Sequence, residues 1–195
     1  MTEAQKLEVK ELDIRFVKNL YAQLNARNQK IHDLRKMFGR KTTDDFPAYM
    51  SFRTLTNAQI PSAYEEVYYL VACMFCEMEK PSDADRMHVK FETLLHRMWN
   101  DTDSTDRRIS RLLDTDFESG QFVSQFVRLA RRAAKELYSN EALDYVSLLT
   151  DLKFWDEKEH YSRHKWARTI TAYYGDDEKI KEFSKEVVEN EEVVK

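Results

Sequence analysis

Four cations occupy one face of a predicted helix over residues 121–137, at positions i, i+3, i+4 and i+7. They are Arg128, Arg131, Arg132 and Lys135. Guanidinium and ammonium groups bind phosphate oxygens, so this spacing could hold a polyanion along the helix. Glu136 is the only carboxylate within reach of this face. Two interpretations stay open: a nucleic acid lies against the helix, or the face is solvated or paired with carboxylates that the fold brings in.

Two pairs of residues have spacings that metal or redox sites use. Cys73 and Cys76 form a C-x-x-C pair, but the chain has no other cysteine to complete a zinc site. Their apolar surroundings favour a place in the core of a protein from a reducing compartment. His160 and His164 stand at i and i+4 of a predicted helix, a spacing that could ligate zinc. A solvated histidine pair is the simpler interpretation, because no further ligand set accompanies them.

Aspartates at 101, 103 and 106 resemble the start of a calcium-binding loop. The sixth position of that loop is Asp106 instead of glycine, and the twelfth is Leu112 instead of glutamate, so calcium binding is not expected. The chain also lacks the G-x-S-x-G, phosphate-loop and H-E-x-x-H motifs. We therefore expect no catalytic centre, no metal and no cofactor.

The composition predicts an all-α protein. Among 195 residues, 42% are hydrophobic, which suffices for a core, while three glycines and three prolines leave few residues for hairpins. Long segments repeat apolar residues with the helical period. No apolar run approaches 18 residues, and the first residues are charged, so we expect neither a membrane span nor a signal peptide and place the protein in the cytoplasm.

We expect a two-lobed helical bundle of about nine helices. The one over residues 61–78 is apolar on most of its circumference and should be the central buried element of the first lobe. Gly39 should end the second helix with positive φ. Thr105 or Asp106 should cap the sixth helix, and Ser139 or Asn140 the eighth. The expected helices cover approximately residues 5–24, 27–38, 47–55, 61–78, 84–99, 107–114, 121–137, 140–155 and 157–174.

The polar stretch 100–106 has the composition of a linker, so we place a lobe boundary there. The expected parts are an N-terminal lobe (1–100), a C-terminal lobe (101–175) and an acidic tail (176–195) whose charge density favours partial disorder. The formal net charge is −4, and the tail alone carries eight acids against four bases. Residues 1–175 are therefore neutral overall. Within them, segments 27–41 and 107–135 are strongly basic, so basic patches lie on a neutral body.

Several short motifs, in this order and spacing, resemble one family. Arg35 and Lys36 are followed by a Pro-Ala-aromatic triplet at 47–49, and Arg107, Arg108 and Ile109 open a helix. A Leu-Asp-aromatic start at 143–145 leads to Leu152 and Trp155, and Trp-Ala-Arg follows at 166–168. The chain is similar to the small (CasB) subunit of type I-E Cascade, the RNA-guided CRISPR surveillance complex. The resemblance covers roughly residues 27–175 and leaves out the acidic tail.

The resemblance implies a non-catalytic small subunit that is present as two copies and works with other Cascade subunits and guide RNA. Basic helix faces would hold the displaced DNA strand, stabilise the R-loop in antiviral defence, and bind single-stranded DNA or RNA without sequence preference. The alternative is a helical scaffold subunit whose arginines pair with a partner's carboxylates. The expected phosphate contacts are Arg27, Lys30, Arg35, Lys36, Arg107, Arg108, Arg111, Arg128, Arg131, Arg132, Lys135 and Arg168.

Overall fold

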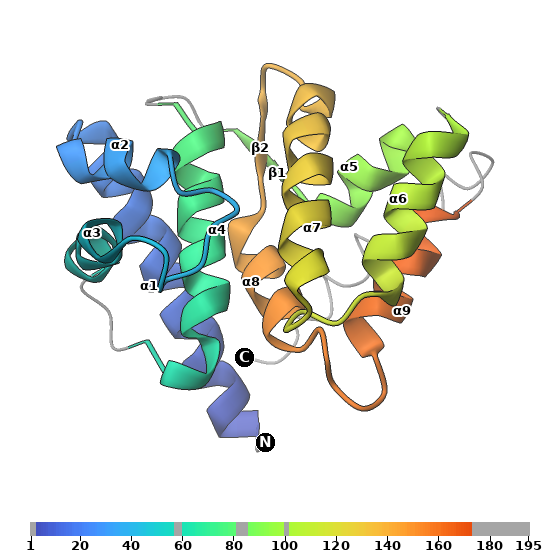
Figure 1. Ribbon diagram of the computed structural model, residues 1–195, viewed down its shortest axis with the longest axis horizontal. Coiled ribbons are helices and arrows are strands. Elements are labelled where there is room, and N and C mark those ends of the chain that lie inside the picture. Colours follow the sequence, from blue (N-terminus) through green and yellow to red (C-terminus); the bar gives the residue numbers. More distant parts are fainter. Residues whose placement is uncertain (1–2, 57–59, 81–85, 100–101, 173–195) are drawn as a thin grey trace, which may run out of the picture.

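The structure is a computed structural model that describes residues 3–56, 60–80, 86–99 and 102–172. Within these residues it contains nine α-helices, so the expectation of a helical bundle is confirmed. Two 3-10 turns, η1 (Ser62–Tyr64) and η2 (Ala134–Glu136), and two short strands, β1 (Met87–Val89) and β2 (Glu141–Leu143), complete the described elements (Figure 1). The expected tail over 176–195 lies outside the described residues. The helices are α1 (Glu3–Asn25), α2 (Gln29–Arg35), α3 (Phe46–Thr56), α4 (Glu65–Met78), α5 (Phe91–Met98), α6 (Asp103–Asp114), α7 (Gly120–Ala133), α8 (Tyr145–Lys153) and α9 (Tyr161–Ile170).

Helix α4 is the centre of the core, as its composition predicts. Every residue from Val67 to Cys76 is buried, because the helix is apolar around its whole circumference. Helices α1, α2, α3, α7 and α8 all pack against it. Figure 1 shows α4, α7 and α6 side by side across the front of the molecule, with α2 and α3 on one flank and α9 behind α6.

Two segments that we expected to be helical form a parallel pair of strands. Strand β1 (Met87–Val89) pairs with β2 (Glu141–Leu143) in the register Met87↔Glu141. The predicted helices over 84–99 and 140–155 therefore begin later, at α5 and α8. Asp144 explains the second boundary: its carboxylate accepts the Ser147 N–H at 2.9 Å, so Asp144 and not Ser139 or Asn140 caps α8. Three-residue strands are too short for periodicity to separate them from a helical turn.

Other boundaries move for local reasons. The helix predicted over 27–38 is the shorter α2, and the 3-10 turn η1 precedes α4 where a continuous helix from Pro61 is predicted. Thr102 caps α6 through the Thr105 N–H, so this helix starts before the predicted caps Thr105 and Asp106. Residues before Tyr161 form a turn in which His160 has φ of 47°, which shortens the predicted helix 157–174 to α9. Helix α7 ends at Ala133, and the 3-10 turn η2 (Ala134–Glu136) continues it. Helix ends of this kind depend on single side-chain bonds and not on the apolar period.

Contacts between helices cross the lobe boundary that we place near residue 100. Helix α8 packs against α1 and α4, whereas α5 packs against α7 and α9. Lys153 of α8 forms a 2.5 Å ion pair with Asp13 of α1, both side chains being fully buried, and Tyr68 of α4 donates its hydroxyl to the same carboxylate. This pair joins segments 140 residues apart. The division into two lobes stays a prediction.

Gly39 brings the end of the α2 segment against α7. Its φ is +99°, as predicted, but α2 ends at Arg35, so Gly39 closes the turns over 36–39 and not the helix itself. A Cβ atom there would lie 3.1 Å from Cγ2 of Val127. Residues other than glycine rarely adopt this backbone conformation, and the Val127 side chain would have to shift to accommodate a methyl group here. Gly39 therefore sets the distance between the first basic segment and α7.

We expect Gly39→Ala to lower the free energy of unfolding by about 1–3 kcal/mol, because it adds both backbone strain and a contact with Val127. Gly120→Ala is the matched control, since a Cβ there meets nothing within 4 Å. It should raise the free energy of unfolding by about 0.4–1 kcal/mol. Urea denaturation measures both variants, and equal effects would show that Gly39 is not conformationally required.

Candidate nucleic-acid interface

Helix α7 carries the predicted basic face. Ser119 caps the helix by accepting the Gln121 N–H, and Phe122, Phe126 and Ala130 lie in the core. The opposite face reaches the surface, where Arg128 and Arg131 are exposed and Arg132 is partly buried. Because α7 ends at Ala133, Lys135 extends from η2 and not from the helix face that the period predicts.

Two of the four cations have partners inside the fold. Arg131 forms a forked pair with Glu77 of α4, with Nε–Oε1 and Nη2–Oε2 distances of 2.6 and 3.0 Å. These bonds raise the pKa of Arg131, whose guanidinium also lies 5.6 Å from the ring centre of Phe38. Arg132 donates to the Thr105 hydroxyl of α6 at 2.5 Å. In the described part of the chain, Arg128 and Lys135 form no ion pair.

Helix α6 adds three more cations beside this face. Ile109 and Leu112 point into the core, so the arginines at 107, 108 and 111 extend from the exposed side. Arg107 lies 3.8 Å from Asp103, but the two side chains are 74% and 93% exposed, so water screens the pair. No ion pair of Arg108 or Arg111 occurs among residues that the structure describes. Helices α6 and α7 pack together and Arg132 connects them through Thr105, so the two sets of cations extend from adjacent helices.

The first basic segment surrounds α2. Asn28 caps this helix, and the cations predicted around it are Arg27, Lys30, Arg35 and Lys36. Arg27, which has φ of 54°, and Lys36 are exposed, while Lys30 is partly exposed. Arg35 donates from Nε to the backbone carbonyl of Cys76 at 2.7 Å. That carbonyl belongs to the last turn of α4, where helices leave acceptors without intrahelical partners.

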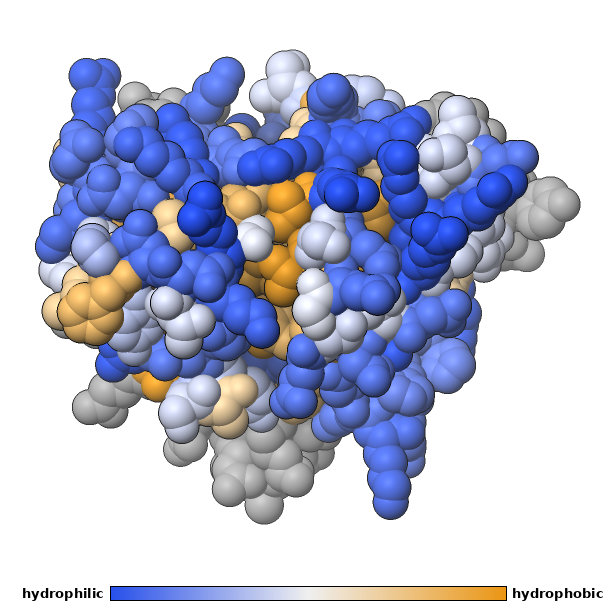
Figure 2. Space-filling view, in the orientation of Figure 1, coloured by the Kyte–Doolittle hydropathy of each residue, from blue (hydrophilic) through white to orange (hydrophobic). Residues whose placement is uncertain are grey.

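The two basic segments meet at the C-terminal end of α4. Arg35 binds Cys76 from the α2 side, and Arg131 binds the next residue, Glu77, from the α7 side. Arg132 then connects α7 to α6 through Thr105. These bonds bring α2, α7 and α6 together around the end of α4. We call the accessible cations of these elements and of η2 the basic band: Arg27, Lys30, Arg35, Lys36, Arg107, Arg108, Arg111, Arg128, Arg131 and Lys135. Figure 2 shows hydrophilic side chains over these elements, around a central apolar hollow.

The hollow corresponds to a cavity of about 350 Å³ between α4, the start of α7 and the end of α8. Its apolar lining includes Val67, Leu70 and Val123, and Arg40 and Lys41 contribute the charged side chains of the α2–α3 connection. Glu66, Glu118 and Asp156 also line the cavity, so its charged rim is mixed and does not by itself favour a polyanion.

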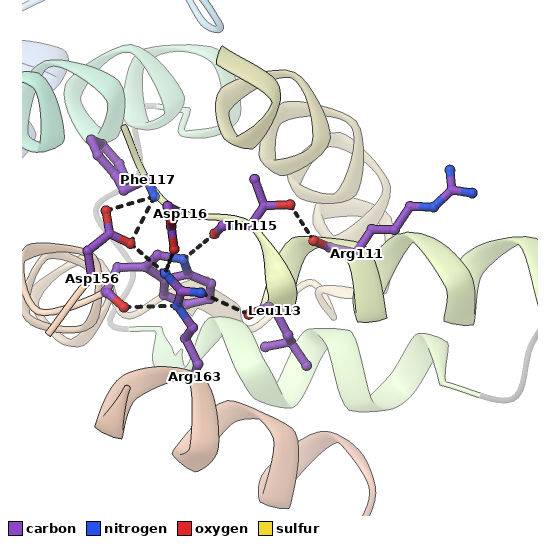
Figure 3. A network of polar contacts seen from close by, with 8 residues as sticks. Arg111, Leu113, Thr115, Asp116, Phe117, Asp156 and Arg163 are labelled. Carbon is purple, nitrogen blue, oxygen red and sulfur yellow. Dashed lines mark hydrogen bonds and ion pairs between the residues drawn. The ribbon is translucent and has the colours of Figure 1, made fainter. Parts of the chain in front are cut away.

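Arg163 of α9 joins the ends of four elements, and sequence analysis did not identify it. Figure 3 shows its guanidinium between two carboxylates: Nη2 lies 2.5 Å from Asp116 and 2.6 Å from Asp156. Its Nε donates to the Trp155 carbonyl at 3.0 Å, and Asp156 accepts the Phe117 N–H. Arg163 lowers the pKa of Asp116 through this hydrogen bond. The network holds the α6–α7 connection against the end of α8, and so fixes the two basic helices relative to each other.

The remaining candidates lie apart from the basic band. Arg168 is exposed on α9, and no described contact brings it to the other cations. Cys73 and Cys76 are buried in α4, and burial raises the pKa of Cys73 well above its usual value and that of Cys76 to about 12. Both thiols therefore stay protonated near neutral pH.

His160 precedes α9 in a left-handed conformation, so the expected i, i+4 pair with His164 on one helix does not form. Within the described ranges no cluster of His, Cys, Asp and Glu could hold a metal ion. Over the same ranges, none of the helices has the length and apolar character that crossing a membrane needs.

Comparison with known proteins gives a family and a fold. The family model of the CRISPR-associated protein Cse2 matches residues 15–174. A chain of a CRISPR RNA-guided surveillance complex superposes with a TM-score of 0.64 at 17% identity, covering 83% of this chain and 92% of that one. A Cse2-family protein of Thermus thermophilus gives 0.62 at 20% identity, covering 81% and 96%. CasB of M. ruber gives 0.56 at 15% identity, covering 90% and 96%. No curated protein matches.

Replacing Arg163 by lysine should lower the free energy of unfolding by about 1–3 kcal/mol, because one ammonium nitrogen cannot reach the two carboxylates and the Trp155 carbonyl that the guanidinium spans. Arg168→Lys on the same helix is the control and should change it by less than about 0.5 kcal/mol. Chemical denaturation of both variants provides the measurement. Equal stability of Arg163→Lys and the wild type would mean that the network does not fix the α6–α7 connection.

Proposed function

The chain belongs to the CRISPR-associated Cse2 family, and from this premise we propose that it is the small subunit of an RNA-guided surveillance complex whose basic band holds single-stranded nucleic acid. The resemblance to the CasB small subunit is confirmed by the family model, which covers residues 15–174. In this proposal the protein is not an enzyme. It acts in the cytoplasm with other complex subunits, guide RNA and a second copy of itself.

The continuity of the basic band is the observation that carries the proposal. Cations from segments far apart in the sequence converge at the end of α4, where Glu77 is already paired with Arg131. The same elements carry the acids Asp33, Asp103, Asp106, Asp114 and Glu136, fewer than the cations beside them. Arg108, Arg111 and Arg128 are exposed, and no ion pair with a described residue occupies them. Like charges held together without counterions favour an external polyanion.

The band is suited to phosphates and not to reading bases. Its side chains extend from the sides of helices, and arginine or lysine on phosphate fixes a strand without selecting its sequence. In RNA-guided complexes base pairing reads the sequence, and the protein stabilises the strand that pairing displaces. We propose that the band contacts this displaced strand and thereby stabilises the R-loop.

The second candidate is a helical scaffold subunit without direct nucleic-acid contact. The forked pair between Arg131 and Glu77 shows the chemistry that such a subunit would use, because a partner's carboxylates could bind the exposed arginines in the same geometry. The two candidates differ in the ligand of the unpaired arginines, and so in the salt dependence of binding to single strands.

The test replaces Arg108, Arg111 and Arg128 together by alanine, because these arginines are exposed and form no ion pair with a described residue. With three phosphate contacts removed, the slope of log K against log salt for an arbitrary single strand should fall by about two. The control replaces Lys10, Arg15 and Lys18 of α1, which are exposed cations of equal total charge on a helix that packs against α3, α4 and α8. This control variant should show the same slope of log K against log salt as the wild type.

The same triple variant separates the candidates within the assembled complex. If it assembles with the guide RNA but shortens the lifetime of the opened target duplex, the arginines hold a strand. If single-strand binding is unchanged and the folded variant fails to copurify with the other subunits, the band is a protein interface and the scaffold function replaces the proposal.

Glu77→Gln tests whether Arg131 is shared between the fold and the ligand. Removing the carboxylate frees the guanidinium, so affinity for a single strand at low salt should rise about two- to fivefold and the salt slope should increase by about 0.7. Fluorescence anisotropy titrations at several salt concentrations measure both values. An unchanged slope would restrict Arg131 to a structural role between α4 and α7.

A further inference from the structure

Tyr138 is an exposed aromatic residue at the end of the basic band. It follows η2 closely, and 64% of its surface is accessible. It stands three positions after Lys135, so their Cα atoms lie at most about 11 Å apart. Its neighbours Ser139 and Asn140 are exposed polar residues. The ring therefore lies in a polar, cationic part of the surface and not within a broad apolar patch.

The fold holds this ring in place from one side. The Arg97 guanidinium lies 4.7 Å from the ring centre of Tyr138. Arg97 is itself fixed by two bonds to Glu141, at 2.7 and 2.8 Å, and by a 2.8 Å bond to the Glu136 carbonyl. Glu141 also accepts the Tyr138 N–H at 3.0 Å. The exposed ring is thus supported by a buried carboxylate through an arginine that covers one of its faces.

The charges of this support are stable near neutral pH. The hydrogen bond from Arg97 lowers the pKa of Glu141 and raises that of the Arg97 guanidinium itself. The stability that this bond contributes is present above the usual carboxyl pKa and is lost as the pH falls through the lowered pKa of Glu141. A ring fixed in this way loses little conformational freedom when a ligand stacks on it.

The Tyr138 ring is held in place and covered on one face by Arg97, while most of its surface stays accessible to solvent. Such a ring can stack against another planar group. Every nucleobase has such a face, and stacking on aromatic side chains is a sequence-tolerant way of holding single strands. A partner protein's apolar side chain would gain more from a wider apolar surface. Met87, which donates its N–H to the Asn140 carbonyl, is the exposed apolar side chain on the neighbouring strand. The cations that precede Tyr138 favour the nucleobase.

We propose that Tyr138 is a stacking site for one base of the single strand whose phosphates contact the basic band, with Arg97 as the positioning residue behind the ring. The inference rests on the proposed function and adds to it a contact that is not electrostatic. Phosphate contacts hold the strand against the surface, and the Tyr138 ring holds a base at the end of α7.

The experiment uses the full chain and a single strand of mixed sequence. Tyr138→Ala should weaken binding about tenfold at low salt, because stacking of one base is lost. The salt slope should stay unchanged, since no phosphate contact is removed. Tyr138→Trp should bind at least as tightly as the wild type. Tyr161→Ala is the matched control, because Tyr161 is 67% exposed at the start of α9, and its variant should bind like the wild type.

A second measurement removes the nucleobases from the ligand and keeps Tyr138 in the protein. The wild type should bind a strand of abasic deoxyribose phosphates about tenfold more weakly than a normal strand of equal length, whereas Tyr138→Ala should bind the two strands alike. This comparison is a cycle between protein and ligand, so it isolates the stacking contact. The wild-type part of the cycle needs no variant and remains valid even if Tyr138→Ala lowers the melting temperature.

Each other outcome overturns the inference in a recognisable way. If the wild type binds single strands with the expected salt slope but neither the abasic strand nor Tyr138→Ala changes affinity, stacking fails and the proposed function stands. If the wild type shows no salt-dependent binding, the proposed function fails as well. If Tyr138→Ala binds strands normally but no longer copurifies with the complex, Tyr138 contacts a protein.

Discussion

The C-terminal end of α4 is the constraint on which the rest of the structure depends. An α-helix that is apolar all round must be covered on every side, yet its last carbonyls need donors. The Arg35 side chain donates to the Cys76 carbonyl, and the Arg131 guanidinium pairs with the carboxylate of the next residue, Glu77. The same two arginines bring α2 and α7 to a common edge. Satisfying one helix end thus assembles a surface that neither basic segment forms alone.

The predictions from sequence succeeded where a pattern repeats over many residues. The apolar circumference of α4 and the buried stripe of α7 follow from the apolar period, and both are present. The positive φ of Gly39 follows from its residue type, although α2 ends before it, at Arg35. Strands β1 and β2 were missed, because their pairing joins Met87 to Glu141 across the chain and leaves no local signal. The side-chain partners of Arg131 and Arg163 could not be predicted from the sequence for the same reason. Glu77 lies 54 residues from Arg131, and Asp116 lies 47 residues from Arg163.

The arginines divide into two groups with different physical roles. Arg97 and Arg163 have fixed carboxylate partners and little exposure, so their charges stabilise the fold and add little to the field outside it. Arg108, Arg111 and Arg128 contribute to that external field. Residue type alone does not reveal this division. For that reason Arg168 was predicted to belong with cations to which no described contact brings it, and Arg163 was not predicted. The number of basic residues indicates a polyanion-binding surface only after the arginines that pair with carboxylates inside the fold are left out of the count.

The buried pair between Asp13 and Lys153 has a consequence for how the chain is made. Helix α8 covers one side of α1 and α4, but it is synthesised long after them. Until residue 153 leaves the ribosome, the apolar surface of α4 has no cover on that side and Asp13 has no cation. A contact across 140 residues also closes slowly. The nascent first half is therefore the state most exposed to aggregation, and completion of α8 is the step that ends that exposure.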